Sequence, residues 1–208
     1  MQIIAMLTML IDHVGIVFFP EVEALRIIGR LAFPLYAYLI VVGWDRTSSR
    51  KRYVLRLLLI GLAAQLPYVW MIGGWEINVI GTFLVVLAVF VLLDKWKSAL
   101  IVIPVIVLAI LFFEYVPFDY GSYALVLMLI YRYLSPSWMF SAHLSLNFFN
   151  VLYTGVFAQV ASVLATILLV YGDRVLQLVN RLKIPRIVWL SFYPVHMLVL
   201  VGCAEVFS

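Results

Sequence analysis

Apolar residues follow one another along the chain in long blocks with few polar interruptions. An α-helix needs about twenty apolar residues to cross a hydrocarbon core about 30 Å thick. Blocks of roughly this kind cover residues 2–19, 25–44, 53–72, 78–93, 98–115, 121–134, 138–152, 155–171 and 187–206. The block 138–152 is rich in Ser, Asn and His, so a re-entrant segment is the alternative there. The pattern predicts an all-α, polytopic membrane bundle of about nine transmembrane helices.

Basic residues gather in alternate connections between these blocks. Twelve of the fourteen Lys and Arg follow the second, fourth, sixth or eighth block, whereas the opposite connections hold six of the ten Asp and Glu. Lys and Arg concentrate in cytoplasmic loops of membrane proteins. The sequence therefore predicts a cytoplasmic N-terminus and an external C-terminus, and this alternation requires an odd number of crossings.

The composition supports the same class. Hydrophobic residues make up 66% of the 208 residues and charged residues 12%, against about 45–50% and about 25% in soluble domains. We expect one transmembrane domain over residues 1–208, in contact with membrane lipid and without a cleavable signal. The net charge of +4 is explained by topology, so no nucleic-acid partner is expected. The single Cys203 excludes an internal disulfide.

Four charged or titratable residues lie in the outer half of the first two blocks. Asp12, His13 and Arg30 share a similar depth, and Arg26 is one turn shallower on the face of Arg30. Such residues are costly in a bilayer and usually serve a purpose. Neighbours on a helix point about 100° apart, so Asp12 and His13 cannot form a dyad. We expect Asp12 to pair with Arg26 or Arg30, which leaves His13 free.

Further polar residues gather toward the same side of the membrane. They are Asn78, Thr82, Asp119, Tyr120, Tyr123, His143, Asn147, Asn150, Gln159, Ser162, Thr166, Tyr193 and His196. Ordinary hydrogen bonding between helices is the favoured explanation for the Ser and Thr residues in these apolar blocks. Three intramembrane histidines with Asp12 and Arg30 instead indicate proton-transfer chemistry, because histidine titrates near neutrality. Metal-binding histidine spacings, a nucleophile elbow and a glycine-rich phosphate loop are absent, so no metal is expected.

Several stretches follow one another over most of the chain, namely "IIAMLTMLIDHVGIVFFP", "LRIIGRLAFPLYAYLIVVG", "KRYVLRLLLIGLAAQLPY", "NVIGTFLVVLAVF", "FDYGSYALVLMLIYRY" and "FYPVHMLVL". Together and in this order they resemble the TraX family of membrane acetyltransferases, which includes pilin N-acetylation proteins. The resemblance marks Asp12, His13, Gly15, Arg26, Gly29, Arg30, Pro34, Asn78, Asp119, Tyr120, Gly121, Tyr193, Pro194 and His196. The chain departs from the family pattern at Val42 and at Ala64-Gln65, where acidic residues are expected.

The resemblance implies transfer of an acetyl group from cytoplasmic acetyl-CoA, at the bacterial cytoplasmic membrane. The acceptor would be an amine or hydroxyl of a peptide, such as a pilin N-terminus, or of a small molecule. We expect His13 to be the general base, with His196 as the alternative base or acetyl carrier. Arg30, Asn78 or Tyr120 would stabilise the oxyanion. The basic cluster from Arg46 to Arg56 would attract the CoA phosphates, chiefly through Arg50, Lys51 and Arg52.

Two other classes of function fit the same residues. A small-solute or proton-coupled transporter would line its path with Asp12, His13 and Arg30, although such proteins commonly contain internal repeats, which this chain lacks. A non-catalytic assembly factor would leave the intramembrane histidines unexplained.

Overall fold

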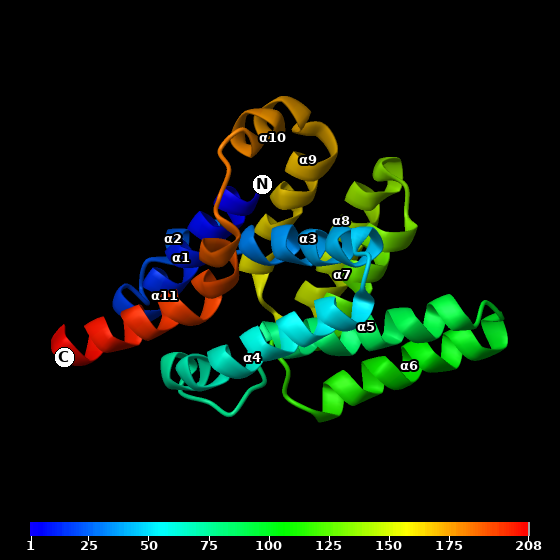
Figure 1. Ribbon diagram of the computed structural model, residues 1–208, viewed down its shortest axis with the longest axis horizontal. Helices are drawn as coiled ribbons and strands as arrows, with labels where there is room; N and C mark the ends of the chain where they lie inside the picture. Colours follow the sequence, from blue (N-terminus) through cyan, green and yellow to red (C-terminus); the bar gives the residue numbers. More distant parts are fainter. Residues whose placement is uncertain (208) are drawn as a thin grey trace.

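A computed structural model describes residues 1–207, and these residues are almost entirely helical (Figure 1). The helices are α1 (Gln2–Phe18), α2 (Glu23–Gly29), α3 (Ala32–Arg46), α4 (Arg50–Ile72), α5 (Val79–Lys95), α6 (Ala99–Tyr115), α7 (Gly121–Tyr133), α8 (Pro136–Thr154), the 3₁₀ helix η1 (Phe157–Ser162), α9 (Val163–Tyr171), α10 (Asp173–Asn180) and α11 (Arg186–Phe207). The predicted all-α class is confirmed.

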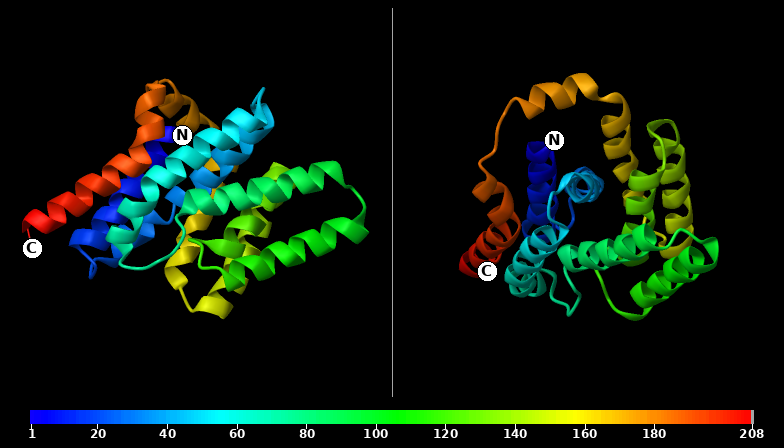
Figure 2. Two further views of the ribbon diagram at one scale, coloured as in Figure 1. Left: turned by 60° about the horizontal axis from the view of Figure 1, so that its bottom comes forward. Right: turned by 45° about the vertical axis from the view of Figure 1, so that its right-hand side comes forward.

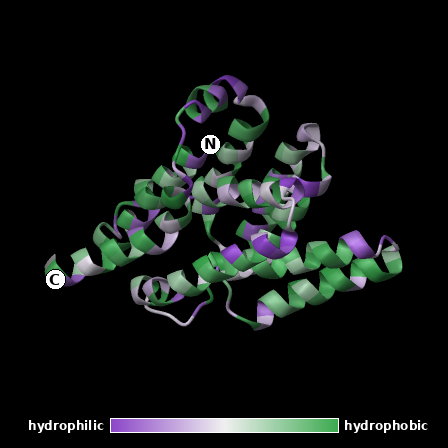
Figure 3. Cartoon of the chain, viewed as in Figure 1, coloured by the Kyte–Doolittle hydropathy of each residue, from purple (hydrophilic) through white to green (hydrophobic). Residues whose placement is uncertain are grey.

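Every predicted apolar block coincides with a helix or a pair of helices. Within residues 1–207, three helical segments are long and apolar enough to cross a membrane, namely Glu23–Arg46, Arg50–Ile72 and Arg186–Val206. A fourth results if the bent pair Phe157–Tyr171 and Asp173–Asn180 forms one span. Many large apolar side chains are exposed, for example Leu62, which is 66% exposed. Figure 3 shows that hydrophobic residues run along most of the helices. The count of nine crossings and the orientation stay predictions.

The second predicted span is interrupted between α2 and α3, where a continuous helix was expected over 25–44. The cause is Pro34 in the first turn of α3, because a proline ring clashes with the carbonyl four residues earlier. That carbonyl belongs to Arg30. The break is short, because Arg30 and Leu31 keep right-handed helical backbone angles and Glu23–Arg46 remains one helical segment.

Helix α3 occupies the centre of the molecule (Figure 1) and contacts α1, α5, α7 and α9. On one side lie α1, α2 and α11, and α11 packs against α4 as well as α1. On the other side lie α7 and α8. Among the side chains that α3 buries are Phe33, Leu35 and Trp44, each less than 5% exposed. The N-terminal end of α3 is thus surrounded by several helices.

The short helix α10 was not predicted. Its axis is turned 84° from that of the preceding segment, and Figure 2 shows it arching over the start of α1. The ammonium group of Met1 donates a hydrogen bond to Asn180 Oδ1 at 2.7 Å. This contact ties the arch to the N-terminus.

Helices α1 and α2 pack closely because glycines face the opposing helix. A Cβ at Gly29 would collide with the carboxylate of Asp12, and a Cβ at Gly15 would lie 2.9 Å from Leu25 Cβ. Small residues let transmembrane helices approach in this way. The glycine at position 29 is therefore required for the contact between α1 and α2.

We expect Gly29→Ala to lower the free energy of unfolding by about 1–3 kcal/mol, the usual cost of overpacking. The added methyl group must push Asp12 away from α2. Thermal unfolding of the purified protein in detergent measures the effect. The matched control is Gly202→Ala in α11, where a Cβ meets nothing within 4 Å. Equal melting temperatures for the two variants would contradict the close packing.

Candidate functional site

A cavity of about 100 Å³ opens where α1, α2, α3, α4 and α11 approach one another. The polar or aromatic residues that line it include seven of the predicted site residues. They are Asp12, His13, Arg26, Arg30, Asp119, Tyr120 and Tyr193. We call this space the catalytic cavity, because it contains most of the residues for which the sequence predicts a catalytic role.

Two histidines from opposite ends of the chain meet beside the catalytic cavity. Nδ1 of His13 lies 2.7 Å from Nε2 of His196. The ring planes differ by 5° and the ring centres are 4.9 Å apart, so the rings lie edge to edge in nearly one plane. The sequence placed both histidines in the membrane but did not predict that they form a pair.

The direction of the hydrogen bonds in this pair follows from the backbone. Nδ1 of His196 lies 2.6 Å from the carbonyl oxygen of Phe192. A carbonyl only accepts, so in the neutral ring Nδ1 of His196 carries the hydrogen and Nε2 is the acceptor. His13 therefore donates from Nδ1 to His196. This leaves Nε2 of His13 as the basic nitrogen available to a group in the cavity.

Asp12 is held in the way that the sequence predicted. Arg26 Nη1 donates to Asp12 Oδ1 at 3.0 Å, and both side chains are largely buried. The pair links α1 to α2. Asp12 therefore has a structural partner, and its neighbour His13 points to α11 instead.

Arg30 lies at the break between α2 and α3 and reaches toward two elements. Its Nη1 donates to Tyr120 Oη and to Gln159 Oε1, both at 3.4 Å. Within residues 1–207, Nε of Arg30 and Nε2 of Gln159 are buried without a hydrogen-bond partner. Buried donors are rarely left unpaired in proteins. Arg30 therefore keeps one N–H outside the hydrogen bonds that its Nη1 makes to Tyr120 and Gln159.

The backbone of Tyr120 adopts φ 62°, a left-handed conformation that is uncommon for a residue with a side chain. The Tyr120 ring stacks on the Phe33 ring, with the ring centres 3.7 Å apart and an interplanar angle of 6°. Gly121 follows with φ 37°. Strained backbone of this kind clusters at functional sites, and here it holds the Tyr120 hydroxyl beside Arg30.

Asp119 lies in the connection between α6 and α7. This connection is fixed to the one before α5, because Asp119 N donates to the Ile77 carbonyl at 2.9 Å and Thr82 Oγ1 donates to the Asp119 carbonyl at 2.6 Å. Burial, followed by the nearby Glu76 carboxylate, raises the pKa of Asp119 to about 7. The carboxyl is thus able to hold a proton near neutral pH.

Asn78 does not line the catalytic cavity, and its predicted role as an oxyanion donor stays a prediction. Its Nδ2 donates to the Gly61 carbonyl at 2.8 Å and to Gln65 Oε1 at 2.7 Å, and its Oδ1 accepts from Ile80 N at the start of α5. The side chain caps α5 and joins it to α4. Both amide hydrogens are used in this task.

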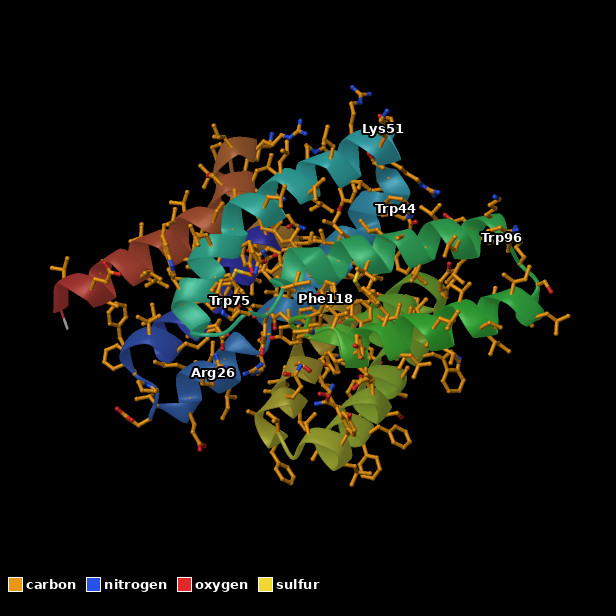
Figure 4. All side chains as sticks on the ribbon, turned by 90° about the horizontal axis from the view of Figure 1, so that it is seen from below. Arg26, Trp44, Lys51, Trp75, Trp96 and Phe118 are labelled. Carbon is orange, nitrogen blue, oxygen red and sulfur yellow. The ribbon has the colours of Figure 1, made fainter. Side chains whose placement is uncertain are left out.

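The predicted phosphate-binding residues Arg50, Lys51 and Arg52 lie at the start of α4, away from the catalytic cavity. Figure 4 shows Lys51 and Trp96 at one end of the molecule and Arg26 and Trp75 at the other. Arg50 is separated from the cavity residue Tyr68 by eighteen residues of helix, or about 27 Å. Arg50 also forms an ion pair with Asp94 at 2.8 Å. These three residues do not line the catalytic cavity.

The third histidine belongs to a separate polar network. His143 Nε2 lies 2.8 Å from Tyr123 Oη, and its Nδ1 lies 2.6 Å from Thr166 Oγ1. Asn147 and Ser162 complete the network between α7, α8 and η1. All these groups are buried and bonded to one another, in agreement with ordinary interhelical hydrogen bonding. Asn150, predicted on the same stripe, is bonded to Thr154 near the outer surface.

Comparisons with known proteins place the chain in a family. The model of the family described as TraX protein matches residues 1–204. The chain is also similar to the probable fimbrial assembly protein FimC, serogroup H1, of Dichelobacter nodosus, with 27% identity over 152 residues. That alignment covers 65% of this chain and 62% of the relative, and no solved structure matches the chain. Because the family model covers nearly the whole chain, this protein belongs to the TraX family.

Proposed function

We propose that this protein is a membrane-embedded acetyltransferase that moves an acetyl group from acetyl-CoA to an acceptor amine or hydroxyl. The observation that carries the proposal is the His13–His196 pair, which gives His13 a free basic nitrogen at a cavity that also contains Arg30. Acyl transfer needs a base, an oxyanion donor and exclusion of water. The apolar helices around the site would provide the last of these.

In the reaction, His13 Nε2 takes the proton from the acceptor as its nitrogen or oxygen attacks the thioester carbonyl. Arg30 stabilises the negative oxygen of the tetrahedral intermediate with its unpaired N–H. When the C–S bond breaks, the imidazolium of His13 returns the proton to the sulfur of CoA. His196 accepts from Nδ1 of His13 throughout and acts as a positioning residue. The products are the acetylated acceptor and CoA.

A neighbouring cavity of about 420 Å³ would admit the acceptor. It shares Arg30, Asp119 and Tyr120 with the catalytic cavity and is lined in addition by Glu114 and Tyr153. Two carboxyl groups and several aromatic rings suit an acceptor with an amino group. In the predicted orientation this cavity faces the outside of the cell, and the donor approaches from the cytoplasm through a bundle of nine crossings.

The relative's description as a probable fimbrial assembly protein supports a pilus subunit as the acceptor. A subunit anchored in the membrane would present its N-terminal amine close to the bilayer. This choice agrees with the amine-binding character of the neighbouring cavity.

The test uses the full chain reconstituted in proteoliposomes with acetyl-CoA and a peptide that carries the N-terminus of a pilin from the same cell. We expect CoA release that depends on the peptide, and a gain of one acetyl group on its N-terminal amine by mass spectrometry. The same peptide with a blocked N-terminus is the control. Uptake of a solute without CoA release would indicate the transporter instead.

A further inference from the structure

Another cavity, of about 480 Å³, lies at the end of the molecule where the basic residues gather. It is bordered by the start of α1 and by α3, α4 and α11. We infer that this cavity, called the donor channel here, holds the phosphates and the pantetheine arm of acetyl-CoA, and that the thioester reaches His13 past Tyr36. The inference rests on the proposed function and names the donor site that the function requires.

Three arginines from three helices border the donor channel: Arg46 at the end of α3, Arg56 in α4 and Arg186 at the start of α11. Within the described residues, no ion pair involves any of them, whereas Arg50 and Arg132 at the same end are paired with Asp94. Three positive charges without acidic partners at one opening attract a polyanion. CoA carries a pyrophosphate and a 3′-phosphate, which arginine binds well.

The walls beyond the arginines are largely apolar and include Leu39, Ile40, Leu57 and Ile60. The uncharged pantetheine arm suits such walls. Arg46 and Tyr36 are ten residues apart on α3, a rise of about 15 Å, and Arg186 and His196 are also ten residues apart on α11. An extended pantetheine arm separates the phosphates from the thioester by a similar length. The geometry therefore matches the donor from the arginines to the base.

Tyr36 lines both the donor channel and the catalytic cavity. Its ring stacks on Trp189 with the ring centres 5.1 Å apart and an interplanar angle of 10°. Because Tyr36 lines both spaces, it marks the narrow point of the inferred route. The acetyl end of the donor would pass this pair, so Tyr36 is a positioning residue that sets where the thioester stops.

The test measures binding of CoA and of pantetheine, which lacks the phosphates, to the purified full chain in nanodiscs. We expect Arg46→Gln, Arg56→Gln and Arg186→Gln each to weaken CoA binding by about tenfold or more, the value of one charge-assisted hydrogen bond. Pantetheine binding should change by less than about twofold, which also reports correct folding. Lysine at these positions should restore part of the loss. The matched controls are Lys51→Gln and Arg52→Gln, which remove charge from the same end without touching the channel.

A second variant tests the narrow point. Tyr36→Trp should reduce the acetyl transfer rate by about tenfold or more through misplacement of the thioester, with CoA affinity little changed.

The outcomes separate the donor channel from the proposed reaction. If CoA binding is unchanged in all three arginine variants and the wild type transfers acetyl groups, the donor channel is wrong and the proposed reaction stands. Arginine-dependent CoA binding without any acetyl transfer would overturn the reaction instead. A transfer rate unaffected by Tyr36→Trp would exclude the route past Tyr36.

Discussion

Acetyl transfer is expected to fall by about 10²–10⁴ in kcat when His13 is replaced by alanine, because that is the usual contribution of a general base. His13 lines the catalytic cavity, and its Nδ1 is engaged by His196. In the proposed mechanism, its Nε2 is the nitrogen that removes the acceptor proton. The measurement is the initial rate of CoA release with saturating acetyl-CoA and acceptor peptide.

Two further variants separate chemistry from structure. His196→Asn keeps an acceptor for the His13 N–H and should retain more activity than His196→Ala. His143 lies outside the catalytic cavity and is bonded to Tyr123 and Thr166, so His143→Gln should lower the melting temperature and reduce kcat of the folded protein much less than His13→Ala does. If His13→Ala transfers acetyl groups at the wild-type rate, His13 is not the base. A loss in His143→Gln as large as in His13→Ala would show that folding, not chemistry, is being measured.

The second large effect is expected at Arg30. Arg30→Met should reduce kcat/KM by about 10²–10³, the typical cost of removing an oxyanion donor. Arg30→Lys keeps the charge but has one ammonium group in place of the guanidinium, whose Nη1 contacts Tyr120 and Gln159 while Nε carries a further N–H, so it should restore only part of the activity. Steady-state kinetics on proteoliposomes, with both substrates varied, measures the loss.

The control for Arg30 is another buried arginine far from the cavity. Arg132, only 9% exposed at its side chain, pairs with Asp94 at 2.7 Å near the opposite end of the molecule. Arg132→Met should lower thermal stability, because it leaves Asp94 with one fewer partner, but should not change the kinetics of the folded fraction. Equal kinetic losses in Arg30→Met and Arg132→Met would rule out a specific role for Arg30 at the oxyanion.

Much of the site could be inferred from residue types and helix geometry. The separation of Asp12 from His13 follows from the 100° step between helical neighbours. The depths predicted a pair of Asp12 with Arg26 or Arg30, and the structure pairs Asp12 with Arg26. The roles of Asn78 and of Arg50 could not be inferred in this way. Asparagine and arginine are both common in binding sites. Here the Asn78 amide is hydrogen-bonded to Gln65 and Arg50 forms an ion pair with Asp94, and sequence spacing identifies neither partner.

The sequence alone determined the helical class, the positions of the apolar segments and the family, because these depend on local hydrophobicity and on the order of motifs. Only the tertiary structure decided which polar groups meet. His13 and His196 are 183 residues apart, and their contact depends on how α1 packs against α11. Likewise Tyr36 joins two cavities only because α3 lies at the centre of the bundle. Such contacts depend on helix packing, which the periodicity of a single segment does not specify.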